Sequence, residues 1–193
     1  FHGVTWSPIH AGKDRTSWSW NEVSPESIAA LERLGVNSVR VYTPITSDTV
    51  LSALTKAGIR VVVSLPYYDD RGVPASEKFD IRSGSYARFI EEHFGKYPPG
   101  SIVEIGNEYN YHPEWFGNDV GRWYDSLEQA ARKIHEINPG IIVATAHGEV
   151  PTADVLTRIP SVGAIGMNIY RGVNPASAVE EFLARIPQTP GAN

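Results

Sequence analysis

The sequence predicts an α/β fold, a (β/α)8 barrel of which about six βα units are present in the 193 residues. Short runs rich in β-branched residues alternate with helical patterns, which is typical of a parallel sheet covered by helices. The segments after the expected strands are long, polar and aromatic, as at 7–21, 66–80 and 108–118, whereas the turns after the expected helices are short. That asymmetry indicates a barrel whose active site lies at the carboxyl ends of its strands.

Four of the expected strands follow a glycine of the kind that ends a helix. These glycines are Gly35, Gly58, Gly100 and Gly140, and a β-rich run begins within a few residues of each. The expected strands are Gly3–Trp6, Ser38–Thr43, Arg60–Leu65, Ile102–Gly106, Ile141–Ala146 and Ala164–Tyr170.

Capping residues mark helices between these strands. Asn138-Pro139-Gly140 ends the longest of them. The expected caps and helices are Ser24-Pro25 before 28–34, Ser83 before 86–96, Asn118 or Asp119 before the helix through Ile137, and Asn174-Pro175 before 178–186.

A doubly wound sheet of six strands would have the same strand count. It is disfavoured because no Gly-rich phosphate-binding fingerprint follows any strand. We therefore expect residues 1–193 to form a single catalytic barrel domain that is incomplete at its C-terminal side, since a barrel needs eight units in about 250 residues. The strand pattern that starts at Gly3 suggests that a leader or upstream domain has been removed.

The composition restricts the partners of the protein. A net charge of −5 gives no basic stripe for nucleic acid or anionic membrane, and no apolar run approaches the roughly 18 residues of a membrane span. The absence of cysteine excludes disulfides and thiolate metal sites. No cofactor is expected, and no metal, because His2, His10, His112 and His147 show no recognised ligand spacing.

The strongest chemical signal is Gly106-Asn107-Glu108, at the end of an apolar strand. A carboxylate there faces the mouth of a barrel. Cleavage of a glycosidic bond needs one carboxylic acid to protonate the leaving oxygen and a second carboxylate to attack or to activate water. Glu108 is therefore the candidate general acid, and Asn107 can hydrogen-bond a sugar hydroxyl. The alternative is a strand-end Glu that only caps the next loop.

With this motif the chain resembles the clan A retaining glycoside hydrolases, which include β-glucanases, β-galactosidases and β-1,3-glucanosyltransferases. Gly106-Asn107-Glu108 is similar to their acid/base motif at the end of strand 4. Residues 35–42 resemble their second strand, which carries an Arg near the nucleophile, and 168–170 resemble the end of their sixth strand, which carries a Tyr that contacts the nucleophile. The resemblance implies Glu108 as acid/base, Asn107 on the sugar 2-hydroxyl, and Arg40 and Tyr170 supporting the nucleophile.

The chain departs from that family in one respect. The family's nucleophile is a Glu at the end of strand 7, so the resemblance places the nucleophile outside these residues. Glu149, after the fifth strand, is the best-placed substitute, although a loop Glu near the mouth describes it better. Glu104 has the strand parity of Glu108 and is expected to be a core polar residue paired with an Arg.

Aromatic residues gather at the strand ends and in the loops that follow. Because sugars present C–H faces that pack on aromatic rings, a set of this size favours a sugar cleft over loop packing. Trp6, Tyr67 and Trp115 are the expected binding residues, and His147, with the parity of Thr145, is expected to bind sugar hydroxyls. The whole set is Trp6, Trp18, Trp20, Tyr67, Tyr68, Tyr109, Tyr111, Trp115 and Tyr170, whereas Trp123 is expected in the core.

These features predict a retaining glycoside hydrolase or transglycosylase that acts on β-linked glucan or a related polysaccharide. Such a substrate favours an extracellular or periplasmic location. Two alternatives stay open: a non-catalytic carbohydrate-binding or scaffold module derived from a barrel glycosidase, which the missing seventh strand favours, and a metal-dependent barrel hydrolase.

A six-stranded array would leave its first and last strands as edges. Residues 3–6 and 164–170 are apolar and lack the Lys or Pro that blunt natural edges. We therefore expect that this chain is not an autonomous monomer. A C-terminal segment, a complementary fragment or a partner chain should supply strands 7 and 8 and bring the nucleophile close to Arg40 and Tyr170.

Overall fold

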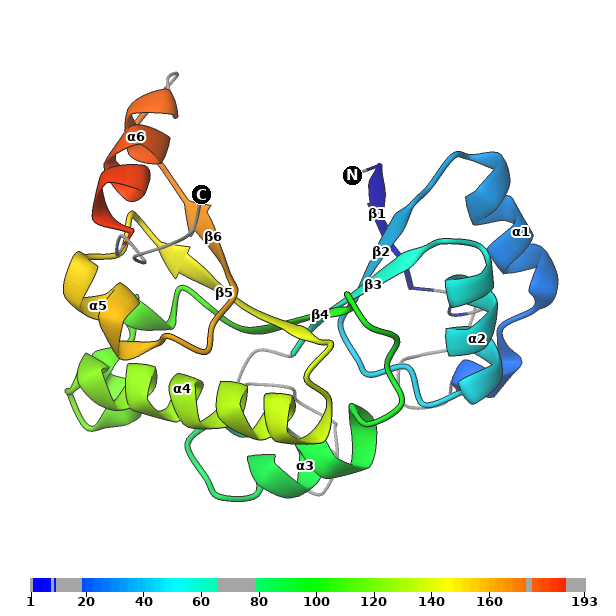
Figure 1. Cartoon of the computed structure of the whole chain (residues 1–193), viewed down its shortest axis with the longest axis horizontal. Coiled ribbons are helices and arrows are strands. Elements are labelled where there is room, and N and C mark those ends of the chain that lie inside the picture. Colours follow the sequence, from blue (N-terminus) through cyan, green and yellow to red (C-terminus); the bar gives the residue numbers. More distant parts are fainter. Residues whose placement is uncertain (1, 8, 10–18, 66–78, 173–174, 187–193) are drawn as a thin grey trace.

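The strands form a single curved sheet in the computed structural model, which describes residues 2–7, 9, 19–65, 79–172 and 175–186. Each strand pairs in parallel with the next along the chain, in the order β1-β2-β3-β4-β5-β6. Figure 1 shows the helices along the outer side of the sheet, with β1 and β6 at its two ends. The strands are β1 (Gly3–Thr5), β2 (Ser38–Val41), β3 (Arg60–Ser64), β4 (Ile102–Asn107), β5 (Ile142–Gly148) and β6 (Ala164–Asn168).

This topology decides between the two predicted architectures. A doubly wound sheet reverses its strand order at a switch point. Here the order never reverses and the helices cover one face of the sheet, so six βα units form part of a (β/α)8 barrel. The predicted fold class is confirmed, and the doubly wound alternative is wrong.

Some of the predicted capping residues cap their helices in the structure, and others do not. The Ser24 hydroxyl accepts from the Ser27 N–H, and the Asp119 carboxylate accepts from the Gly121 N–H, as expected. Ser83 does not cap the helix that begins at Tyr86. The N-cap residue there is Ser85, which makes no side-chain capping bond, and the Ser83 hydroxyl bonds the Asp80 carbonyl and the Ser85 hydroxyl. No helix in the described ranges is long and apolar enough to cross a membrane. The helices are α1 (Pro25–Arg33), α2 (Asp48–Lys56), α3 (Tyr86–His93), α4 (Val120–Ile137), α5 (Ala153–Arg158) and α6 (Ala176–Arg185), with 3₁₀ turns η1 (Trp20–Glu22), η3 (Tyr109–Tyr111) and η4 (Pro113–Phe116).

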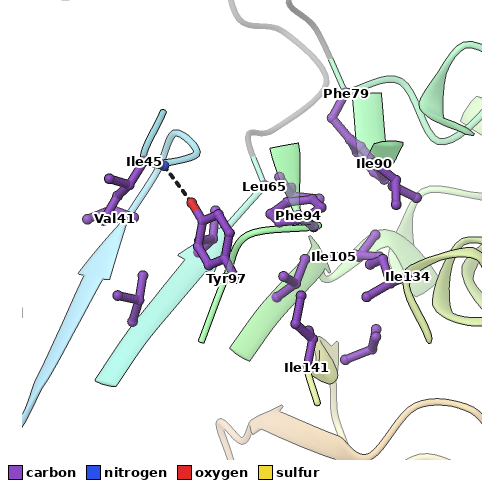
Figure 2. Packing of buried hydrophobic residues seen from close by; sticks show 14 of the residues in the cluster. Val41, Ile45, Leu65, Phe79, Ile90, Phe94, Tyr97, Ile105, Ile134 and Ile141 are labelled. Carbon is purple, nitrogen blue, oxygen red and sulfur yellow. Dashed lines mark hydrogen bonds between the residues drawn. The ribbon is translucent and has the colours of Figure 1, made fainter. Parts of the chain in front are cut away.

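The hydrophobic core lies between the outer face of the sheet and the helices. Alternate residues of the strands point into it, because side chains alternate between the two faces of a strand. Figure 2 shows part of this packing, including Tyr97, whose buried hydroxyl accepts from the Ile45 N–H. The strand residues that are at most 1% exposed are Val39, Val41, Val61, Val63, Val103, Ile105 and Val143, and Trp123 of α4 joins them at 2%.

The inner face of the sheet carries polar and small residues. Arg40 of β2 donates through Nε to the Ser64 hydroxyl of β3 and through Nη2 to the Glu104 carboxylate of β4. The predicted pairing of Glu104 with an Arg is thus confirmed. On β5 the inner positions are Ala144 and Ala146, the residues opposite Glu104 and Asn107.

Candidate active site

The end of β4 makes an irregular turn that presents Glu108. The register with β5 shifts between Glu104 and Asn107, and both Gly106 (φ 75°) and Glu108 (φ 58°) adopt the left-handed conformation. Glycine is needed at position 106 for two reasons. A Cβ there would lie 2.6 Å from the Trp123 ring, and the positive φ of the residue disfavours any other amino acid. The Glu108 N–H still donates to the Ala146 carbonyl at 2.8 Å, which holds the turn on β5.

The half-buried Glu108 carboxylate lies among side chains from β4 and the end of β6. Its Oε1 accepts from Asn168 Nδ2 at 2.9 Å and lies 3.5 Å from the Tyr170 hydroxyl. The same Asn168 amide donates to Asn107 Oδ1 at 3.1 Å. Among the described residues, Oε2 has no hydrogen-bond partner. The structure therefore brings Asn107, Glu108 and Tyr170 together, and Asn168 joins them. The Tyr170 hydroxyl lies near Glu108, whereas the resemblance implies a contact with the nucleophile.

Arg40 lies on the same inner face but in a different network. Its guanidinium is bonded to Ser64 and Glu104, and it lies 5.4 Å from the centre of the Tyr42 ring. The side chain is 40% exposed, and its Nη1 has no partner among the described residues. Arg40 can therefore still bind an anionic group above the inner face.

His147 lies on the other side of the sheet from the Glu108 cluster. It is buried against α4, where Nε2 lies 2.9 Å from the Tyr124 hydroxyl and Nδ1 lies 2.9 Å from the Glu149 carbonyl. The carbonyl can only accept, so Nδ1 carries the proton of the neutral ring and Tyr124 donates to Nε2. Both ring nitrogens are thus engaged within the protein. This placement differs from the expected one, and we leave His147 out of the site.

Burial makes His147 a source of acid sensitivity. It lowers the pKa of His147 below the ordinary 6.5, because desolvation disfavours the charged ring. The unfolded chain binds that proton more readily than the folded protein. The contribution of neutral His147 to the free energy of unfolding is therefore present above pH 6.5, and it is lost as the pH falls through 6.5 towards the folded pKa.

We expect His147→Gln to reduce the pH slope of the unfolding free energy between pH 7 and pH 5 by up to about 1.4 kcal/mol per pH unit, the maximum for one proton. Urea titrations at several pH values measure it. His2→Gln, at an exposed position, is the control. Equal slopes for wild type and His147→Gln would contradict the assignment.

The predicted tryptophans pack into the protein rather than face Glu108. Trp6 follows β1, in the parity that faces the helices, and its ring centre lies 5.7 Å from that of Trp20. Trp115 stacks on His112 at 3.9 Å and meets the edge of Tyr109 at 5.1 Å. Both rings pack against the hydrophobic core, so we leave both out of the site. Tyr67 lies outside the described residues.

Within the described ranges, Glu149 near the mouth is already paired. Arg171, after β6, donates to Glu149 Oε2 at 2.6 Å and to Glu181 Oε2 of α6 at 2.5 Å. Arg185 in turn donates to Glu181 and to the carbonyls of 150 and 151. Glu149 is thus part of an ion-pair network that fixes the loop carrying Tyr170. No group of three or more possible metal-ligand side chains gathers within the described ranges.

Comparisons with known proteins agree with this fold. No protein-family model matches the chain, and no curated protein sequence does. Among solved structures, a Parabacteroides merdae β-glucuronidase superposes with a TM-score of 0.55 at 17% identity over 85% of this chain. An exo-β-1,4-mannosidase from Opitutaceae bacterium strain TAV5 gives 0.54 at 18% identity over 86%. A Bacteroides uniformis β-glucuronidase gives 0.53 at 16% identity over 84%.

These structural neighbours are glycoside hydrolases, and at such low identity the likeness shows the shared fold. The chain spans 21% of the length of each β-glucuronidase and 37% of the mannosidase. What it superposes on is therefore a part of each neighbour.

Proposed function

We propose that the protein is a retaining glycosidase or transglycosylase that acts on β-linked glucan or a related polysaccharide, with Glu108 as its general acid and base. The observation that carries the proposal is the cluster at the ends of β4 and β6, where one Asn168 amide bonds both Asn107 and Glu108. The glycosidase neighbours and the barrel topology support it, since barrel active sites lie at the carboxyl ends of the strands.

In the proposed first step, a second carboxylate attacks the anomeric carbon while protonated Glu108 gives its proton to the glycosidic oxygen, so the bond to the leaving sugar breaks and a glycosyl-enzyme forms. Oε2, which has no hydrogen-bond partner among the described residues, is the oxygen available for this transfer. In the second step the Glu108 carboxylate removes a proton from water or from an acceptor hydroxyl, whose oxygen attacks the anomeric carbon and displaces the second carboxylate. Asn168 holds Oε1 throughout, and Asn107 is placed to bind a hydroxyl of the sugar at the reaction centre.

Retention requires a second carboxylate at about 5 to 5.5 Å from the first. Glu104 and Glu149 are bonded to Arg40 and Arg171, and we propose that neither of them is the second carboxylate. We propose that the second carboxylate comes from further βα units that pair with the free edges of β1 and β6 and close the barrel. Arg40 Nη1, on the inner face, is the group that would hold it.

The test uses the protein expressed from its complete gene, incubated with β-1,3-glucan, β-1,4-glucan and β-1,4-mannan oligosaccharides. We expect new reducing ends or transfer products, with the β anomer appearing first by proton NMR. An α anomer appearing first would contradict retention, and no product from any substrate would contradict the function. A 2-deoxy-2-fluoroglycoside traps the glycosyl-enzyme, and peptide mass spectrometry then locates the second carboxylate. A label on Glu104 or Glu149 would contradict its proposed origin.

A further inference from the structure

In the part of the chain that the structure describes, the exposed aromatic side chains lie at the carboxyl ends of strands. Within the described ranges, three aromatic residues are exposed: Tyr42 at 46%, Tyr111 at 51% and Tyr170 at 81%. They follow the carboxyl ends of β2, β4 and β6, respectively. Trp6 and Trp115 pack against the core, so within the described ranges these tyrosines are the exposed aromatic surfaces at this end of the strands.

Tyr111 is the most firmly held of the three. It ends η3, and its N–H donates to the Glu108 carbonyl at 2.9 Å. The preceding residue, Asn110, bonds both backbone groups of Gly148 at 2.9 Å with its side-chain amide, which fastens the turn to the end of β5. The backbone that carries the Tyr111 ring is therefore fixed on two sides, by Glu108 and by Gly148.

The Tyr111 ring lies on the inner side of β5. A Cβ at Gly148 would come within 2.2 Å of a ring carbon, so the ring packs directly on that glycine. Gly148 has the strand parity of Ala144 and Ala146, whose positions belong to the inner face. It also pairs in register with Asn168, the residue that bonds Glu108. The half-exposed ring therefore borders the carboxylate cluster.

We infer that Tyr111 is a sugar-stacking platform, which binds the C–H face of a pyranose unit of the β-linked oligosaccharide beside Glu108. The inference rests on the proposed function and adds a binding residue to it. A ring that is fixed by its backbone and by Gly148 loses little side-chain entropy on binding, and pyranose C–H groups pack well on such a face.

The experiment measures oligosaccharide affinity by isothermal titration calorimetry with the protein from its complete gene. Glu108→Gln is the background, so that the sugar is not consumed. The probes are cellohexaose, laminarihexaose and β-1,4-mannohexaose. We expect Tyr111→Ala and Tyr111→Leu to weaken binding of the preferred probe about tenfold, and Tyr111→Phe to leave it unchanged. Tyr111→Leu keeps an apolar side chain on Gly148, so it guards against a folding defect.

Leu34→Ala is the matched control, because Leu34 is 75% exposed at the opposite end of the sheet, before β2. Unchanged affinity in Tyr111→Ala and Tyr111→Leu would overturn the platform and leave the proposed function standing. Weakened binding in Tyr111→Phe would overturn stacking in favour of the hydroxyl. If none of the probes binds the background variant, the platform and the carbohydrate substrate fail together, whereas products formed without retention would overturn only the mechanism.

Discussion

Replacing Glu108 by Gln is expected to lower turnover of natural β-linked oligosaccharides by about 10² to 10⁴-fold, the usual contribution of a general acid and base. Gln has nearly the same volume and keeps an oxygen that can accept from Asn168. The loss should therefore come from the missing proton rather than from the fold.

The choice of substrate separates this role from others. A 2,4-dinitrophenyl glycoside needs no proton for departure of its leaving group, so its first step should fall much less in Glu108→Gln. In Glu108→Ala, added azide should replace the activated water and restore turnover of the aryl substrate. Glu114→Gln is the control, since Glu114 lies exposed in the same loop, paired with His112. Equal losses on both substrates, with no azide effect, would argue that Glu108 is not the acid/base.

The strands could be predicted from the sequence because each is a short buried run bounded by turn residues. β6 was expected to reach Tyr170 but ends at Asn168, and β5 extends beyond Ala146 to Gly148. Helices were harder to predict where the capping signal is weak or the helix is short. Ser47 before α2 makes no side-chain capping bond, and α5 has only six residues although the Thr152 hydroxyl accepts from the Val155 N–H at its start.

The Glu108 cluster could be predicted in part, because the carboxyl ends of neighbouring parallel strands meet at one edge. Asn168 was missed as a partner of Glu108, although it is the last residue of β6 and has the parity of Ala164 and Gly166 on the inner face. That parity, with a polar side chain at the carboxyl end of the strand, is the signal that could have found it.

The face of the sheet on which His147 lies could not be predicted from strand parity alone. It does share the parity of Thr145, but that parity also contains Val143, which is fully buried under the helices. The small residues Ala144 and Ala146 mark the inner face instead. Trp6 and Trp115 pack against the core, which a position next to a strand or in the loop after it does not reveal.

The second large effect concerns the glycine of the Gly-Asn-Glu motif. We expect Gly106→Ala to reduce the free energy of unfolding by about 2 to 5 kcal/mol, as the sum of the left-handed backbone penalty and the overpacking against Trp123. Gly106 has φ 75°, and the new methyl group would start 2.6 Å from the indole ring. Because Glu108 lies two residues further on, the same strain should also displace the carboxylate and reduce activity.

Gly35→Ala separates the two causes. Gly35 has a similar φ of 69°, but nothing lies within 4 Å of its virtual Cβ, so only the backbone penalty of about 1 to 2 kcal/mol remains. The unfolding free energies of the two variants, measured by urea denaturation, should differ by the cost of overpacking against Trp123. A double-mutant cycle with Trp123→Leu tests the contact itself, because a smaller side chain makes room for the methyl group. The loss of unfolding free energy in the double variant should then be smaller than the sum of the losses in the two single variants. If those losses are simply additive, Trp123 is not what excludes a side chain at Gly106.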